Sequence, residues 1–529
     1  MSFSLAQILL FIIAYLTGLF AVAHLADRGI IPERITHHPA VYVLSLGVFA
    51  GAMASNGAVS LAHEYGYNFL LYYLGVVLMF AVAAVLLLPL LRLCRVYQLA
   101  SLADVLTFRF RSPWVGAAVT VAMCFTLLPL LALQIQAVAD SIHILAGEGA
   151  ALSSGGPRHN RLALFFCVII TVFSILFGTR HVSSQHRNTG LVTAIAFESL
   201  VKLSALTILL LAAVYSIFGG FDGLQQWLLD NPQINRALTH TIQGNDARML
   251  LVIFFAGAVC MPHIFHMAFA ENNDSRDLRS ATWGLPLYLL LLSLPVLPVA
   301  WAGIKLGHDL PMDYSGLAIG MALNSIPFSA AAFVAGLSAA SATIIVITLA
   351  LANMCLNHLV LPFRPLKIER AQSIYTQLKW LRRTLIAVLI LAGYIFFVTL
   401  GGKQSLTQLG LVAFTGTLQF LPGVIATPYW HKANRAGLLC GLAAGLGVWC
   451  FSMLLPLAGG DHPQWLTALY GRLIGDSDKL WTAVAAVSLA LNTAVFIVVS
   501  VLTKTSKAQR VAAEICSMDD RSRPTRQIL

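Results

Sequence analysis

The chain of 529 residues is 58% hydrophobic and only 10% charged, and its mean hydropathy is +0.80. Soluble globular proteins carry roughly 25% charged residues, so the composition excludes a large soluble domain and indicates a polytopic membrane protein. The net charge is +11, but no basic stretch is interleaved with aromatic residues. Nucleic-acid binding is therefore excluded, and contact with anionic lipid explains the charge better.

Thirteen apolar segments are long enough to cross a bilayer, which takes about 20 mostly apolar residues per helix. The predicted fold is therefore an all-α polytopic membrane protein with about thirteen transmembrane helices, formed by a membrane domain over residues 1–502 and followed by a tail over 503–529. The predicted spans are Leu5–His24, Val41–Leu61, Phe69–Leu91, Trp114–Ala146, Leu162–Phe177, Leu191–Phe218, Leu250–Phe269, Trp283–Ile304, Phe328–Leu361, Leu385–Leu400, Leu406–Ala426, Leu438–Leu457 and Trp481–Leu502.

Lys and Arg gather in alternate loops. With the N-terminus outside, the inner loops and the tail hold Arg92, Arg95, Arg109, Arg111, Arg180, Arg187, Arg364, Lys367, Arg370, Lys379, Arg382, Arg383, Lys504, Lys507, Arg510, Arg521, Arg523 and Arg526. This asymmetry follows the positive-inside rule, supports an odd number of spans and predicts a cytoplasmic C-terminus. The first segment lacks a basic n-region and a cleavage site, so we expect a retained helix.

Small or helix-breaking residues interrupt the second and seventh spans. The second carries them between Gly47 and Gly57, and the seventh carries Met261-Pro262-His263. Interrupted helices at matching positions are typical of transporters built from two inverted five-helix repeats around a midplane site, here about 41–218 and 250–426. The alternative is that Gly and Ala only allow close helix packing in lipid.

Ionisable residues at bilayer depth are costly and therefore informative. Glu198 and Lys202 are spaced i, i+4 and form either a structural ion pair or part of a gate or proton relay. Asp140 follows Gln134 and Gln136 late in the fourth span. These three residues either form a polar wall of a substrate path or hydrogen-bond between helices.

His263 and His266 lie at i, i+3 in the interrupted seventh span. They could face one cavity, bind a carboxylate substrate or take up a proton near neutral pH, and the alternative is that they are packing residues. The sequence shows no nearby Asp, Glu or Cys as a third ligand, so a metal site is not expected.

The ninth span contains a run of small and hydroxyl residues from Gly336 to Thr343. Its carbonyl and hydroxyl oxygens could bind sodium, although the same composition also packs membrane helices closely. Motifs for catalysis are missing, including a P-loop, HExxH and GxSxG, so we expect no enzymatic activity and no organic cofactor.

Several motifs along the full length together resemble those of the sodium/solute symporter family, and most closely the membrane module of CbrA-type sensor histidine kinases. They are Glu64-Tyr65-Gly66-Tyr67, Tyr72-Tyr73-Leu74-Gly75, the segments 97–104 and 128–140, Ala196-Phe197-Glu198-Ser199 with Lys202, Met261-Pro262-His263 with 266–269, 357–362, and Gln419-Phe420-Leu421-Pro422-Gly423. The resemblance implies the leucine-transporter-type fold, with the second to sixth and seventh to eleventh helices as inverted repeats.

The resemblance also implies ion-binding positions between the broken second helix and the ninth helix. Carried over by motif, these positions are Ala52, Ser55, Ala339, Ala342 and Thr343. Ala342 departs from the Ser or Thr that is usual in sodium-coupled members, which leaves Thr343, or Ser341 in a shifted register, to supply oxygen. Proton coupling through Asp140, Glu198 or His263 is the alternative to sodium.

The predicted function is secondary active transport in a bacterial inner membrane. By resemblance, the solute is an amino acid, with histidine as the first candidate. The expected substrate residues are Asn56, Gln134, His263 and His266, and the gate or proton relay is expected at Asp140, Glu198 and Lys202. The alternative is a nutrient-sensing module that acts with a downstream kinase or signalling domain, because residues 512–520 resemble the start of a signalling connector.

Overall fold

The computed structural model describes residues 3–148, 157–178, 188–240, 244–272, 274–362, 371–401, 404–457, 459 and 480–517, and within this part of the chain the regular structure is entirely helical. In chain order, the α-helices of the first half are α1 (Leu5–Asp27), α2 (Glu33–Thr36), α3 (Pro39–Ser45), α4 (Ala58–Tyr65), α5 (Leu70–Ala81), α6 (Leu87–Tyr97), α7 (Leu102–Phe110), α8 (Pro113–Thr126), α9 (Leu128–His143), α10 (Pro157–Gly178), α11 (Thr189–Leu211), α12 (Phe221–Asp230), α13 (Pro232–His240) and α14 (Gly244–Cys260).

The second half continues the helical bundle. Its α-helices are α15 (Pro262–Phe265), α16 (Ser275–Ser293), α17 (Val296–Leu306), α18 (Ser315–Ala322), α19 (Ile326–Cys355), α20 (Ala371–Phe396), α21 (Leu406–Leu418), α22 (Leu421–Tyr429), α23 (Arg435–Trp449), α24 (Leu455–Leu457), α26 (Leu480–Leu502) and α27 (Lys507–Ser517). Short 3₁₀ or π turns that matter below are η1 (Leu46–Phe49), η2 (Met53–Gly57), η7 (His266–Ala270), η8 (Met312–Tyr314), η9 (Leu356–Val360) and η11 (Cys450–Leu454).

The helices confirm a multi-pass membrane protein. In the described part of the chain, ten helices are long and apolar enough to cross a membrane, or up to twelve if each of two bent pairs forms one span. The prediction of thirteen is higher mainly because its third span, Phe69–Leu91, is divided. It falls on α5 and α6, of 12 and 11 residues, and neither is long enough to cross by itself.

Both predicted interruptions are present. The segments Pro39–Phe49 and Met53–Ala81 meet at 73°, and the segments Asp246–Cys260 and Pro262–Ala270 meet at 47°. At the first break, Ala50 has φ −78° and ψ 69° and ends the helical path. At the second, Met261 is extended because the residue before a proline avoids the helical region.

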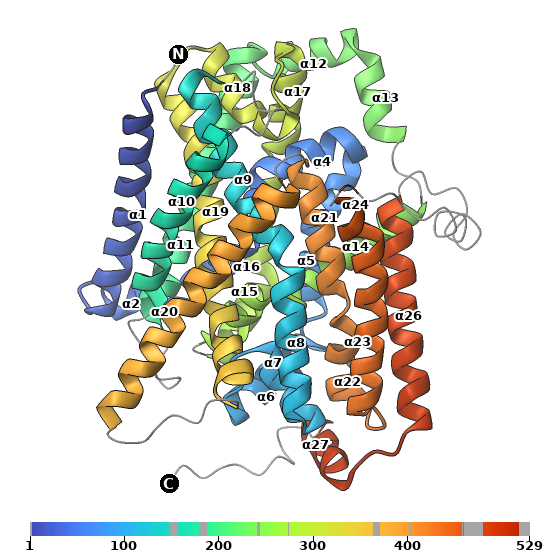
Figure 1. Ribbon diagram of the computed structural model, residues 1–529. Helices are drawn as coiled ribbons and strands as arrows, with labels where there is room; N and C mark the ends of the chain where they lie inside the picture. Colours follow the sequence, from blue (N-terminus) through green and yellow to red (C-terminus); the bar gives the residue numbers. More distant parts are fainter. Residues whose placement is uncertain are drawn as a thin grey trace.

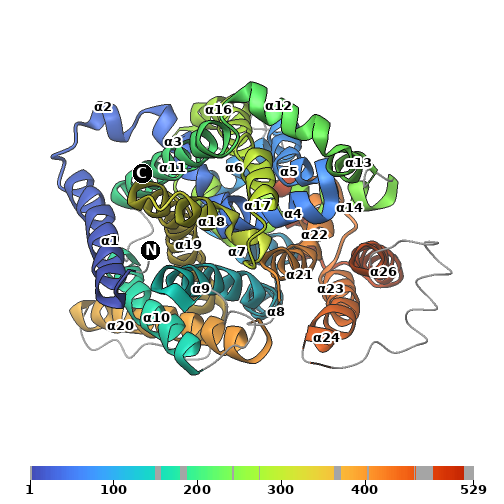
Figure 2. The same ribbon diagram turned by 90° about the horizontal axis from the view of Figure 1, so that it is seen from above.

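The bundle has a buried centre and lipid-facing flanks. In α19, 94% of the membrane-crossing window is buried, whereas only 28% of the window in α1 is buried. Figures 1 and 2 show α1 and α26 on opposite flanks of the bundle, with α23 packed against α26. The helix α19 therefore supplies the central wall against which the broken helices pack.

The two ends of the bundle differ. The helices α6, α7 and α27 lie at one end, called the α7 end below, and α12, α17 and α18 lie at the other, called the α18 end (Figure 1). The long loop after α11 folds into α12 and α13. In the tail, α27 packs against α7 and α22, while residues 518–529 lie outside the described part of the chain, as do Arg180, Arg187, Arg364, Lys367 and Arg370.

Candidate functional site

Side chains from three helices bind the backbone carbonyls at the end of α3–η1. A helix leaves its last four carbonyls without partners inside the helix, and in lipid each needs one. The Lys202 Nζ donates to the Ala50 carbonyl at 2.6 Å and to the Gly47 carbonyl at 3.3 Å. The Thr343 hydroxyl donates to the Val48 carbonyl at 3.3 Å. These contacts hold the first break open.

The third helix that binds this end is α5, and a fourth helix, α9, holds the start of the next segment. The Tyr72 hydroxyl of α5 donates to the Phe49 carbonyl at 3.1 Å. The Ala52 N–H donates to Gln134 Oε1 of α9 at 2.9 Å. Gln134, predicted as a substrate residue, is fully buried and directly binds the break. Close packing explains Gly51, where a Cβ would lie 2.8 Å from Thr343 Oγ1.

The predicted ion-binding residues divide into two groups. Thr343 Oγ1 lies 2.7 Å from the Ala339 carbonyl and reaches the broken helix at Val48, so three oxygens from α19 and η1 meet here. In transporters with broken helices, backbone carbonyls of the unwound segment and nearby hydroxyls coordinate sodium in this way. Ser341 instead donates to the Ser338 carbonyl within α19.

Ala52 and Ser55 lie beyond the Thr343 contact. The Ala52 N–H is bound by Gln134, and the Ser55 hydroxyl donates to Asn56 Oδ1 at 2.8 Å. Ala342 is buried and contributes no side-chain oxygen. The structure thus pairs Thr343 with a backbone position four residues before Ala52.

Glu198 and Lys202 form the predicted pair, with Lys202 Nζ 3.3 Å from Glu198 Oε1, and both side chains are fully buried. The ammonium lies closer to the Ala50 carbonyl than to this carboxylate. The Lys202 ammonium therefore neutralises the Glu198 carboxylate and also connects α11 to the first break.

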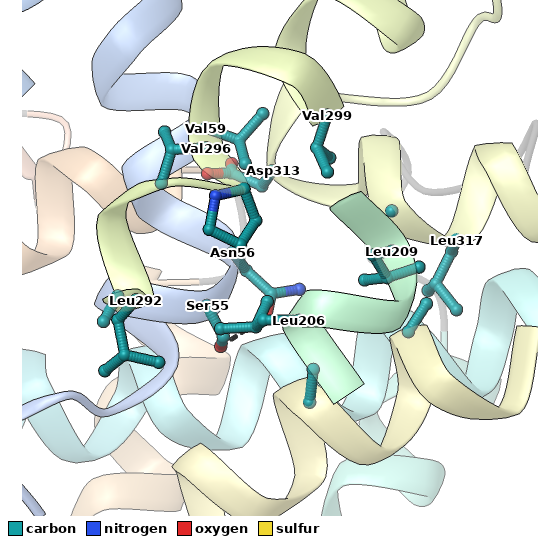
Figure 3. A pocket seen from close by; sticks show the side chains of 15 residues that line it. Ser55, Asn56, Val59, Leu206, Leu209, Leu292, Val296, Val299, Asp313 and Leu317 are labelled. Atoms are coloured by element: carbon teal, nitrogen blue, oxygen red, sulfur yellow. Dashed lines mark hydrogen bonds between the residues drawn. The ribbon is translucent and has the colours of Figure 1, made fainter. Parts of the chain in front are cut away.

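Asn56 lines a small cavity at the start of α4, toward the α18 end. The cavity measures about 20 Å³, which is room for about one water molecule. Figure 3 shows the Asn56 side chain among apolar side chains of α11 and α17, including Leu206 and Val296, with Asp313 nearby. The predicted substrate residue thus faces a small, mostly apolar space whose polar side chains are Ser55, Asn56 and Asp313.

Asp313 of η8 was not predicted from the sequence. It is buried, and burial raises its pKa to about 8, against a smaller lowering by the Leu406 N–H and with further raising by Glu64 and Asp140. At pH 7 the carboxyl is therefore mostly protonated. Its only sequence signal is an acidic residue two positions after Pro311 in a short loop between apolar segments.

Asp140 belongs to a separate buried network. Its Oδ2 accepts a 2.5 Å hydrogen bond from the Tyr314 hydroxyl, and its Oδ1 lies 2.9 Å from His159 Nε2. The ring of His159 stacks on that of His143. Because Tyr314 follows Asp313, this network begins directly beside the Asn56 cavity. Gln136 of the same helix donates to the Gln404 carbonyl at 2.9 Å.

The two predicted histidines of the seventh span do not face one cavity. His263 is 1% exposed in α15, and its Nδ1 has no hydrogen-bond partner among the described residues. His266 lies at the α7 end, where its Nε2 is 3.2 Å from Glu271 Oε1. The expectation that no acidic residue stands near these histidines is wrong, because the chain turns after η7 and brings Glu271 back to His266. No group of three metal-ligating side chains occurs in the described residues.

A large cavity opens at the α7 end. Its volume is about 1070 Å³, and its lining includes His266, Glu271, Asp104, His358 and Asn357. Two contacts cross it. Asn188 binds Glu271 through its N–H at 2.9 Å and its side-chain amide at 3.0 Å.

The second contact joins α7 to η9, where His358 Nε2 lies 2.7 Å from Asp104 Oδ1. The lining of the cavity also includes Arg95, Arg111 and Arg382. These basic residues were predicted to lie in inner loops, and the structure gathers them at one end of the bundle.

Comparison with known proteins shows the fold. No protein-family model matches the chain, and no curated protein sequence matches it. Among solved structures, a Na⁺-coupled sialic acid symporter in a substrate-bound, outward-open state matches with a TM-score of 0.66 and 11% sequence identity. The match covers 96% of this chain and 99% of the symporter. The chain therefore has the fold of a sodium-coupled symporter over nearly its whole length.

Proposed function

We propose that this protein is a secondary active transporter that couples the entry of a small polar solute to a cation gradient by alternating access. The observation that carries the proposal is the first break, where a broken helix, α9 and α19 bring carbonyls, a hydroxyl and an amide together in the bundle centre. The fold shared with a sodium-coupled symporter supports it.

The two cavities support alternating access. A space of about 1070 Å³ opens at the α7 end, whereas the cavity beside Asn56 toward the α18 end holds about 20 Å³. The space beside Asn56 is thus much smaller than the cavity at the α7 end, an asymmetry that fits one state of a carrier. With the α7 end in the cytoplasm, as the distribution of Lys and Arg predicts, this conformation faces inward.

We propose sodium as the first candidate for the coupling ion, held by Thr343 with the Ala339 and Val48 carbonyls. The neighbouring symporter is sodium-coupled, which supports this choice. A proton is the second candidate, since the Asp140 network and Asp313 place two buried carboxyls beside the Asn56 cavity.

We propose an amino acid as the solute, with histidine first in the panel to be tested. The sequence resemblance supports this class, and the Asn56 amide and the Asp313 carboxyl could bind its polar groups. The neighbouring symporter carries sialic acid, so that solute belongs in the same panel.

Counterflow in proteoliposomes tests transport itself. Vesicles containing the purified protein are loaded with unlabelled solute, diluted into labelled solute and sampled over time. We expect a transient overshoot of labelled solute, because a carrier exchanges one molecule for another, and we expect Asn56→Ala to reduce it. Saturable binding without any overshoot, for every solute of the panel, would contradict transport.

A sensing role is the second candidate, and one contact favours it. The tail helix α27 packs against α7, and α7 is joined to the end of the central helix through Asp104 and His358. A change at the α7 end would therefore reach α27. Solute binding that alters the exposure of Cys516 of α27 to a thiol reagent, without counterflow, would support this role.

A further inference from the structure

The Lys202 ammonium occupies a position where a metal cation would otherwise be expected. The C-terminal end of a helix carries a partial negative charge on its free carbonyls. At the end of α3–η1, the Ala50 and Gly47 carbonyls both accept from Lys202 Nζ. The side chain is 0% exposed, so water does not share these contacts.

We infer that Lys202 is a tethered cation of the first break: it permanently fills one cation position at the Gly47 and Ala50 carbonyls, and leaves only the Thr343 position for an exchangeable ion. The charge comes from α11, a different helix from the one that is broken. The ammonium therefore holds α11 against the break and also offsets the partial negative charge of the free carbonyls.

The surroundings of Lys202 account for its charge. Glu198 lies one turn earlier on the same helix, 3.3 Å from the ammonium. From α16, the Tyr288 hydroxyl donates to the Ser199 carbonyl, and Tyr15 of α1 lies close enough to Glu198 to interact with it. One carboxylate and the two carbonyls of Gly47 and Ala50 thus face one ammonium, and oxygen ligands of this kind are what a bound monovalent cation would need.

The number of ions that are exchanged during transport rests on the proposed function. The position of the Lys202 ammonium at the break does not. If the ammonium holds one position, the break binds at most one exchangeable cation. Removal of the lysine should create a second cation position, and purified protein can show this without any transport.

Chemical rescue of Lys202→Ala tests the inference. The substitution removes three methylenes and the ammonium, and n-propylammonium replaces these atoms. We expect n-propylammonium chloride to raise the melting temperature of the purified variant by at least about 2 °C. 1-Propanol, which has the same shape without the charge, should not do so. Sodium should also stabilise the variant more than the unsubstituted protein.

Lys305→Ala is the matched control. Its ammonium also donates to a backbone carbonyl, that of Ile217 at 2.9 Å, but at an exposed position. It should show no such rescue. If Lys202→Ala folds only in medium containing n-propylammonium or sodium, the inference holds. If these cations have no effect on it, whether it folds in every medium or in none, the inference is wrong.

A failure of counterflow with a positive rescue would leave the tethered cation standing and reject transport. An absence of rescue with normal counterflow would reject the tethered cation and leave the proposal of transport standing.

Discussion

At the scale of single residues, the Thr343 hydroxyl joins the central helix to the first break. It contacts the Val48 carbonyl of the broken helix and the Ala339 carbonyl of its own. Its position was predicted from the small hydroxyl run of the ninth span and from the family resemblance. Its partner Val48 was not, because only the fold decides which carbonyl of an interrupted helix faces a given hydroxyl.

We expect Thr343→Ala to raise the sodium concentration needed for half-maximal solute binding by about fivefold, which corresponds to the loss of one interaction of ~1 kcal/mol. Titration of solute binding against sodium measures this shift. Thr348→Ala is the matched control, because its hydroxyl is equally buried in α19 but donates only within that helix. An unchanged sodium requirement in Thr343→Ala would remove this residue from the ion site.

Asp313 predicts a dependence of stability on pH. Burial raises its pKa to about 8, whereas an aspartate in an unfolded chain titrates near 3.9. The folded protein therefore binds more protons than the unfolded one between about pH 4 and pH 8. The contribution of this group to the free energy of unfolding falls as the pH rises through that interval.

We expect Asp313→Asn to remove part of the stability loss between pH 5 and pH 8, because the amide cannot ionise. Thermal unfolding across this range in the same detergent measures the effect. Asp222→Asn, at an exposed position in α12, serves as the control and should keep the dependence of the unsubstituted protein. Parallel curves for Asp313→Asn and the unsubstituted protein would show that Asp313 is not the titrating group.

At the scale of elements, the two breaks were predictable and the third span was not. Gly and Ala between Gly47 and Gly57, and Pro262 in the seventh span, directly limit helix continuity. The division of the third predicted span into α5 and α6 has no such signal, because residues 82–86 are apolar throughout. Hydropathy measures length in an apolar solvent and does not register a local turn within it.

Close packing around Gly51 at the first break predicts the effect of a substitution there. A Cβ at Gly51 would lie 2.8 Å from Thr343 Oγ1 and 3.0 Å from Gln134 Nε2. We expect Gly51→Ala to cost about 1–3 kcal/mol of stability by overpacking and to abolish counterflow. Melting temperature and counterflow measure the two effects.

Gly18→Ala controls for the change of glycine to alanine in a membrane helix. Gly18 lies within α1, and a Cβ there meets nothing within 4 Å. This variant should unfold at or slightly above the temperature of the unsubstituted protein, since alanine favours a helix by about 0.5–1 kcal/mol. Equal behaviour of the two variants would mean that close packing at Gly51 is unimportant.

At the scale of the whole molecule, composition and periodicity were enough for the membrane class and the helical fold. The grouping of site residues was not predictable in the same way. Asn56, Gln134, His263 and His266 were expected to line one substrate path, but they lie in a small cavity, at the two breaks and at the α7 end respectively. Asp313 and Glu271 enter these places from loops, and loop positions depend on tertiary packing.

The two ends of the molecule differ in how much space they enclose. For the proposed carrier, the large cavity at the α7 end and the small cavity beside Asn56 would belong to one state, with both breaks between them. Transport as proposed then requires a second state, in which the cavity at the α7 end narrows around His266, Glu271, Asp104 and His358.

The most direct test of the central claim is uptake of labelled histidine, beside other amino acids and sialic acid, into proteoliposomes under an imposed sodium or proton gradient. We expect accumulation above the external concentration under one of the two gradients, with loss of accumulation when an ionophore dissipates that gradient and in vesicles containing Gly51→Ala. Saturable binding with no accumulation of any solute under either gradient would contradict it.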